Sequence, residues 1–83
     1  MMKLSEEMLK LVKEVIDKRN PKLKSLLPSI QAMEPIENKD VIALCWELTQ
    51  ELLETGFKEN NQPNRRGKIL YKLTGYVNQL LKE

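Results

Sequence analysis

The stretch that decides the fold is residues 39–57, which reads KDVIALCWELTQELLETGF. Apolar residues recur in it at the spacing of an α-helix, and they form two stripes separated by Thr49. The first stripe contains Val41, Leu44, Cys45, Leu48 and Leu52, and the second contains Ile42, Trp46, Leu53 and Phe57. A helix that is apolar over more than half its circumference is either central in a bundle or has one stripe in the core and the other against a partner.

The ends and the polar side of this segment also carry predictions. We expect a helix from about Lys39 to Thr55 with Asn38 as its N-cap, ended by Gly56 in the left-handed conformation, with Phe57 folding back on Leu52 or Leu53. Three glutamates share one side of the helix at i, i+4 and i+7: Glu47, Glu51 and Glu54. Because no His or Asp accompanies them, they predict a solvated face rather than a metal or acid–base site.

The chain before this segment predicts one long helix and one interrupted helix. Residues 4–18 are amphipathic, with Ser5 as the expected N-cap. Asn20-Pro21 ends that helix and starts the next, because proline disfavours the α conformation in the residue before it. Residues 23–33 carry leucines on one side but include Pro28, which predicts either a kinked helix or two short helices.

The chain after it predicts the longest loop and a last helix. Residues 58–67 are polar and contain Pro63, whereas residues 65–81 show helical periodicity with Asn64 as the expected cap. No segment has the period-two alternation typical of strands. We therefore predict one all-α domain, residues 1–83: a small antiparallel helical bundle of three long helices plus one short or kinked helix.

The composition excludes several kinds of enzyme. The 83 residues include no histidine and a single cysteine, Cys45, so a His-dependent hydrolase, a multi-cysteine zinc site and an internal disulfide are ruled out. Cys45 lies on the first apolar stripe, and we expect a buried core thiol. No apolar run approaches the roughly 18 residues of a membrane span. We expect a cytoplasmic protein that is not an enzyme and that has no cofactor or metal.

Charge is distributed unevenly along the chain. Residues 1–24 hold seven bases and four acids, residues 25–57 one base and six acids, and residues 58–83 six bases and two acids. The densest basic cluster lies at the start of the last helix and contains Arg65, Arg66, Lys68 and Lys72. Basic side chains at a helix N-terminus suit phosphate or an acidic partner, although acids of the preceding helix could neutralise them. Tyr71 falls off the apolar face, either as a partner contact or as a half-buried ring.

These observations favour a protein that acts by binding another protein or a second copy of itself, as an adaptor, a regulator or a self-assembly module. The proposed anchors are the residues of the second stripe: Ile42, Trp46, Leu53 and Phe57. The sequence leaves open whether Trp46 and Phe57 lie in the core instead. Nucleic-acid binding through the basic cluster is the alternative, and it predicts an affinity that falls steeply with salt.

The order of the segments resembles a known family. An opening amphipathic helix is followed by the turn DKRNPKL at residues 17–23, a leucine-rich short helix and two longer helices. This pattern resembles the small immunity proteins, of the enterocin A type, that protect bacteria from their own class II bacteriocins. The resemblance implies an antiparallel four-helix bundle. It also implies recognition of a toxin–receptor assembly at the inner face of the membrane, through a surface such as the last helix and its tail.

Overall fold

The computed structural model describes residues 3–81, and their regular structure is helical. In chain order the elements are α1 (Glu6–Arg19), the 3-10 helix η1 (Pro21–Leu26), α2 (Leu27–Ala32), α3 (Asn38–Thr55) and α4 (Arg65–Gln79). Within residues 3–81 there is no strand, only two isolated β-bridges, which join Ile36 to Leu81 and Phe57 to Pro63. The all-α prediction is confirmed.

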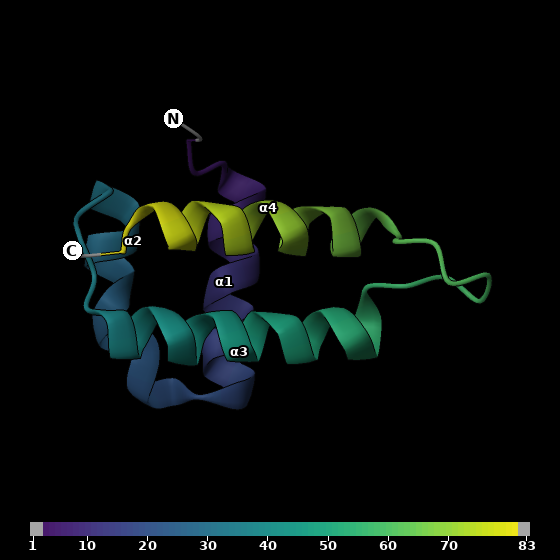
Figure 1. The fold of residues 1–83 in the computed structure, drawn as a ribbon, viewed down its shortest axis with the longest axis horizontal. Helices are drawn as coiled ribbons and strands as arrows, with labels where there is room; N and C mark the ends of the chain where they lie inside the picture. Colours follow the sequence, from purple (N-terminus) through teal and green to yellow (C-terminus); the bar gives the residue numbers. More distant parts are fainter. Residues whose placement is uncertain (1–2, 82–83) are drawn as a thin grey trace.

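The helices form two layers. Figure 1 shows α3 and α4 side by side and running in opposite directions, with the loop between them extending beyond the rest of the molecule. Helix α1 crosses behind this pair and contacts both of its members. The short helices η1 and α2 connect α1 to α3 at the end of the pair opposite the loop. One broad face of the α3–α4 pair is therefore covered by α1.

Most helix boundaries follow from local chemistry. The side chain of Ser5 accepts a hydrogen bond from Met8 N at 3.1 Å, and that of Asn64 accepts one from Gly67 N at 2.7 Å, so both predicted N-caps are confirmed. Pro28 lies in the first turn of α2, where a missing N–H breaks no helical bond, and this segment forms two short helices, η1 and α2. The prediction for Asn38 was wrong by one residue, since Glu37 has the extended cap conformation.

The core lies between α1 and the α3–α4 pair. The first apolar stripe of α3 supplies Val41, Leu44 and Leu48, which are buried as predicted. Buried aliphatic residues meet them from α1 and α4, chiefly Val12, Val15, Ile16, Leu70, Leu73 and Val77. The hydroxyl of Tyr76 donates to the carbonyl of Ile30 at 2.6 Å and ties α4 to α2. The α3–α4 pair is therefore held against both α1 and α2.

The ends of α3 and α4 that flank the loop approach each other through two glycines. A Cβ on Gly67 would lie 2.1 Å from the carbonyl oxygen of Gly56, so no side chain fits there. The prediction of a left-handed Gly56 was wrong, because its φ is −92°. Gly56 is needed for space instead, since a Cβ there would lie 2.5 Å from Leu52 Cδ1 and 3.1 Å from Gly67 Cα.

Candidate functional site

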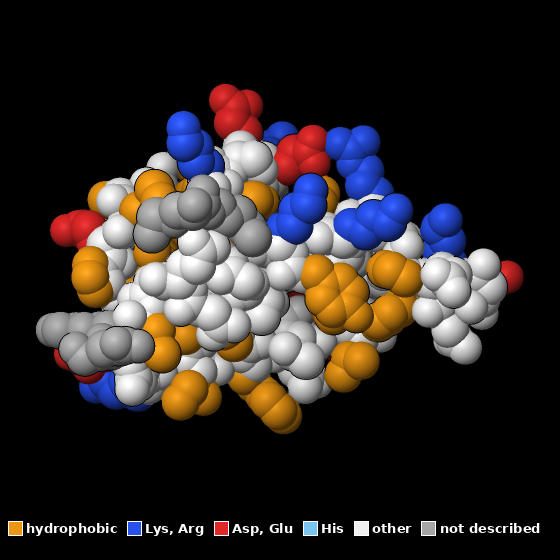
Figure 2. All heavy atoms as spheres, turned by 45° about the horizontal axis from the view of Figure 1, so that its top comes forward, with side chains coloured by type: hydrophobic (Ala, Val, Ile, Leu, Met, Phe, Trp, Pro, Cys, Tyr) orange, Lys and Arg blue, Asp and Glu red, His pale blue; other side chains and the backbone are white. Residues whose placement is uncertain are grey.

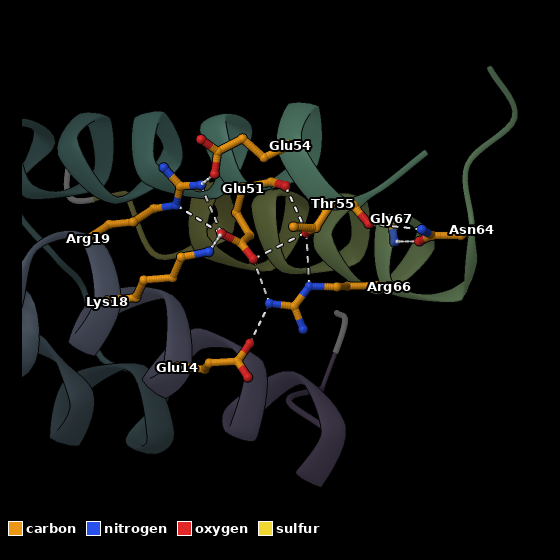
Figure 3. A network of polar contacts seen from close by, with 9 residues as sticks. All are labelled: Glu14, Lys18, Arg19, Glu51, Glu54, Thr55, Asn64, Arg66 and Gly67. Atoms are coloured by element: carbon orange, nitrogen blue, oxygen red, sulfur yellow. Dashed lines mark hydrogen bonds and ion pairs between the residues drawn. The ribbon is translucent and has the colours of Figure 1, made fainter. Parts of the chain in front are cut away.

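The most unusual residue of α3 is Glu51, a carboxylate that is fully buried. Its Oε1 accepts hydrogen bonds from Lys18 Nζ at 3.1 Å and Arg19 Nε at 2.9 Å, both from the end of α1 (Figure 3). Its Oε2 accepts from Arg66 at 2.6 Å, at the start of α4, and from the hydroxyl of Thr55 at 3.1 Å. The prediction of a solvated face was wrong for Glu51, because the fold brings cations from two other helices onto it.

The environment of Glu51 fixes its protonation state. Burial raises the pKa of this carboxyl, but the hydrogen bonds from Arg66, Lys18 and Arg19 outweigh that effect and lower the pKa to about 2. A second set of acids surrounds the cations, since Arg66 also pairs with Glu14 and Arg19 also pairs with Glu54 (Figure 3). Glu51 is therefore ionised at neutral pH.

This cluster joins helices rather than offering a reactive group. A carboxylate with such a low pKa and both oxygens occupied is a poor proton acceptor at neutral pH. Of the other two glutamates on this side of α3, Glu54 is exposed and Glu47 is partly exposed. Among residues 3–81, no group of three or more acidic, Cys or His side chains is arranged to hold a metal ion. We therefore treat the Glu51 cluster as the brace that positions α3 and α4.

The basic cluster predicted at the start of α4 is divided between two roles. Arg66 points into the Glu51 cluster, as Figure 3 shows, and Arg65 donates to Glu7 of α1 at 2.7 Å. Lys68 and Lys72 are exposed and have no ion-pair partner within residues 3–81. Acids of α1 and α3 thus engage the two arginines, while the two lysines extend from the surface of α4.

The second apolar stripe of α3 is exposed along its helical part. Ile42, Trp46 and Leu53 are 68%, 63% and 64% exposed, so Trp46 does not belong to the core. Phe57 follows the end of the helix and is less open, at 36%, and its backbone pairs with Pro63 in the loop. The structure therefore places three of the four proposed anchors together on one row of α3.

Two contacts establish how α3 and α4 are aligned. Cys45 Sγ lies 3.8 Å from the side-chain oxygen of Asn78, and Gly56 touches Gly67. The two contacts are separated by eleven residues on each helix, so residues at the same level have numbers that add up to 123, as 45 and 78 or 56 and 67 do. By this rule Tyr71 of α4, which is 54% exposed, is level with residue 52 and therefore one residue away from the level of Leu53 on α3.

The exposed rows of α3 and α4 form one surface, which we call the outer face. It contains Ile42, Trp46, Thr49 and Leu53 from α3, Tyr71, Thr74 and Asn78 from α4, and Leu81 just after it. A shallow groove runs across one end of it, lined by residues of both rows including Ile42, Trp46 and Asn78. None of the eight residues carries a charge. In Figure 2, hydrophobic side chains lie in several groups on the face that is shown, and Lys and Arg side chains lie above the group at the right.

The two threonine hydroxyls of the outer face are already engaged within the chain. The hydroxyls of Thr49 and Thr74 donate to the carbonyls of Cys45 and Leu70, one turn earlier on their own helices. Cys45 lines the groove and is half-buried rather than fully buried as predicted, because it lies between the core and the outer face. Burial raises the pKa of its thiol, so it is not an activated nucleophile.

Sequence reasoning identified the α3 row of the outer face but not its α4 row. Tyr71 was the one signal in α4, as a ring off the apolar side of the helix, and its meaning depends on the alignment of the two helices. No helix within the described residues is long and apolar enough to cross a membrane.

Comparisons with known protein families, with curated proteins and with solved structures find no match to this chain.

Proposed function

We propose that this protein acts without catalysis, by binding a polypeptide through the outer face. The observation that carries the proposal is the exposure of Ile42, Trp46 and Leu53, each more than 60% exposed, on one row of α3. Single exposed hydrophobic residues are common, but a contiguous apolar surface of this kind marks an interaction site. Tryptophan is also among the residues most enriched at the energetic centres of protein interfaces.

The rigidity of the outer face supports the same proposal. Helices α3 and α4 are joined by the Gly56–Gly67 contact at one end, and the backbone N–H of Ile36 donates to Leu80 O at 2.7 Å near the other. The Glu51 cluster holds both helices to α1. A surface that is ordered before binding loses little conformational entropy when a partner docks.

The resemblance to bacteriocin immunity proteins suggests one kind of foreign partner. It implies recognition of a toxin–receptor assembly through the last helix, and α4 supplies three of the eight residues of the outer face. Because α4 forms part of the outer face, a toxin–receptor assembly is one candidate partner for that face. The experiment below separates it from self-association by the mass of the captured product.

Photo-crosslinking tests the proposal directly. A benzophenone amino acid replaces Trp46 in one variant and Lys13, an exposed residue of α1, in a control variant. We expect irradiation of cells producing the full chain to give a polypeptide adduct from position 46 and not from position 13. Equal yields, or no adduct at position 46, would refute binding through the outer face.

A further inference from the structure

The two long edges of the outer face carry opposite charge. Beyond the α3 row lie Glu47 and Glu54, and beyond the α4 row lie Lys68 and Lys72. These positions follow from helical spacing, since Lys68 precedes Tyr71 by three residues and Lys72 follows Lys68 by four. Figure 2 shows Lys and Arg side chains above the group of hydrophobic side chains at the right. On the α3 edge, Lys39 is paired with Glu37 at 3.8 Å and Glu54 is paired with Arg19, although the Glu54 side chain stays 60% exposed. Glu47 has no ion-pair partner within residues 3–81.

We propose that the partner is a second copy of this chain, bound outer face to outer face about a two-fold axis that runs parallel to α3 and α4. This inference rests on the proposed function of the outer face. The axis places α3 of one protomer over α4 of the other, so the acidic edge of each protomer meets the basic edge of its partner. Such an interface is isologous and closes after two subunits.

The alignment of α3 and α4 makes the pairing specific. Rotation about this axis keeps each residue at its level, and residue 54 is level with residue 69 by the same rule that pairs 45 with 78. Glu54 therefore meets the partner between the levels of its Lys68 and its Lys72. By the same rule Leu53 packs next to the partner's Tyr71. The same alignment of the two protomers therefore gives both the apolar contacts at the centre and the opposite-charge contacts at the edges.

The other face-to-face arrangement is opposed by the same charges. A two-fold axis running across the helices would place α3 on α3 and α4 on α4. Glu47 and Glu54 would then face the same two glutamates, and Lys68 and Lys72 would face the same two lysines. Like charges brought together at an interface disfavour a complex, so the charge pattern selects the axis parallel to the helices.

Light scattering on the purified chain is the first test. We expect twice the mass of one chain at the upper end of a concentration series, at both low and high salt, because the apolar centre contributes most of the affinity. Lys68→Glu with Lys72→Glu should weaken association at low salt about tenfold or more, by making both edges acidic. Lys13→Glu with Lys22→Glu, the same charge change on exposed residues outside the outer face, should leave the dimer intact.

A crosslinking pair tests the direction of the axis. Gln50 is level with residue 73 by the same rule, so Gln50→Cys in one chain should react with Lys72→Cys in another through a short bismaleimide. Both variants carry Cys45→Ser so that each has one thiol. Gln50→Cys alone should not couple to itself, because Gln50 shares the acidic edge with Glu47 and Glu54 and the two copies of that edge lie on opposite sides of the interface.

Each contrary result overturns a defined statement. Self-coupling of Gln50→Cys without coupling between positions 50 and 72 would reject the axis parallel to the helices. Equal loss of association in both lysine double variants would reject the role of the α4 edge. A monomer at every concentration would reject self-association, while an adduct of a different polypeptide at position 46 would still uphold binding through the outer face.

Discussion

The two sides of α3 reverse the usual expectation of what is buried and what is exposed. On the side that faces α1, the charged Glu51 is fully buried, whereas on the outer face Trp46 is 63% exposed. Arg66, Arg19 and Lys18 compensate the buried charge, but nothing within residues 3–81 covers the indole. The comparison shows that the inner side of α3 assembles the fold, whereas its outer side is exposed and is the surface through which we propose that a partner binds.

The largest expected effect comes from removing the buried charge. Glu51→Gln leaves the cations of Arg66 and Arg19 without their shared carboxylate, and we expect a loss of about 4 kcal/mol in the free energy of unfolding. Urea denaturation measures it. The control is Glu47→Gln on the same helix, which should change stability by less than about 0.5 kcal/mol. Similar values for the two variants would contradict the assignment of Glu51 as a structural brace.

A pair of truncations on one helix sharpens the comparison between its two sides. Leu48→Ala removes a fully buried side chain and should cost about 3 kcal/mol, whereas Trp46→Ala should cost about 0.5 kcal/mol despite the larger side chain. Circular dichroism during thermal unfolding, at a concentration low enough to keep the chain monomeric, gives both values. A Trp46 variant as unstable as the Leu48 variant would show that the indole supports the core.

Acid should act selectively on the inner side of α3. The pKa of Glu51 is lowered in the folded state from its ordinary value of 4.5 to about 2. Its contribution is therefore complete above about pH 4.5 and is lost as the pH falls toward 2, amounting to about 3 kcal/mol. Unfolding free energies measured across this range should fall steeply for the natural chain. Glu51→Gln should give a flatter profile, and an identical slope would contradict the low pKa.

A smaller loss of stability is expected at the Gly56–Gly67 contact, where the ends of α3 and α4 flank the loop. Gly67→Ala places a Cβ against the backbone of Gly56, and the helices must separate to accept it, at a cost of about 2 kcal/mol. Gly75→Ala, in the interior of the same helix, should be neutral or stabilising because alanine favours helices. Thermal unfolding compares the two. Equal tolerance at both positions would mean that the glycine contact does not hold the pair together.

Local signals made much of the fold predictable from sequence. Ser5, Asn64 and Pro28 act within a few residues of themselves. The N-caps at Ser5 and Asn64 were predicted correctly, and of the two alternatives left open around Pro28 the structure has the two short helices. The first apolar stripe of α3 likewise identified Val41, Leu44 and Leu48 as core. These features depend on capping and on helical periodicity, both of which can be inferred from a short window of sequence.

The misassigned features depend on contacts between distant segments. Glu51 lies 32 residues from Arg19 and 15 from Arg66, so its burial could not be inferred from its own helix. Gly56 was predicted to be a left-handed cap because glycine often follows a helix end. Its contact with Gly67, which belongs to another helix, could not be inferred from the local sequence. The α4 part of the outer face also required the alignment of two helices. For the candidate site, sequence alone therefore identified the anchors on α3 but not the surface to which they belong.

The Glu51 cluster has a consequence for how the chain comes apart. Its carboxylate oxygens accept hydrogen bonds from α1 and α4, so detaching either helix alone breaks some of these bonds and leaves the remaining charges of the cluster without part of their partners. Partly unfolded states that keep α3 packed are therefore penalised. We therefore expect opening to be cooperative, with amide hydrogens at the end of α1 and the start of α4 exchanging together rather than one helix at a time.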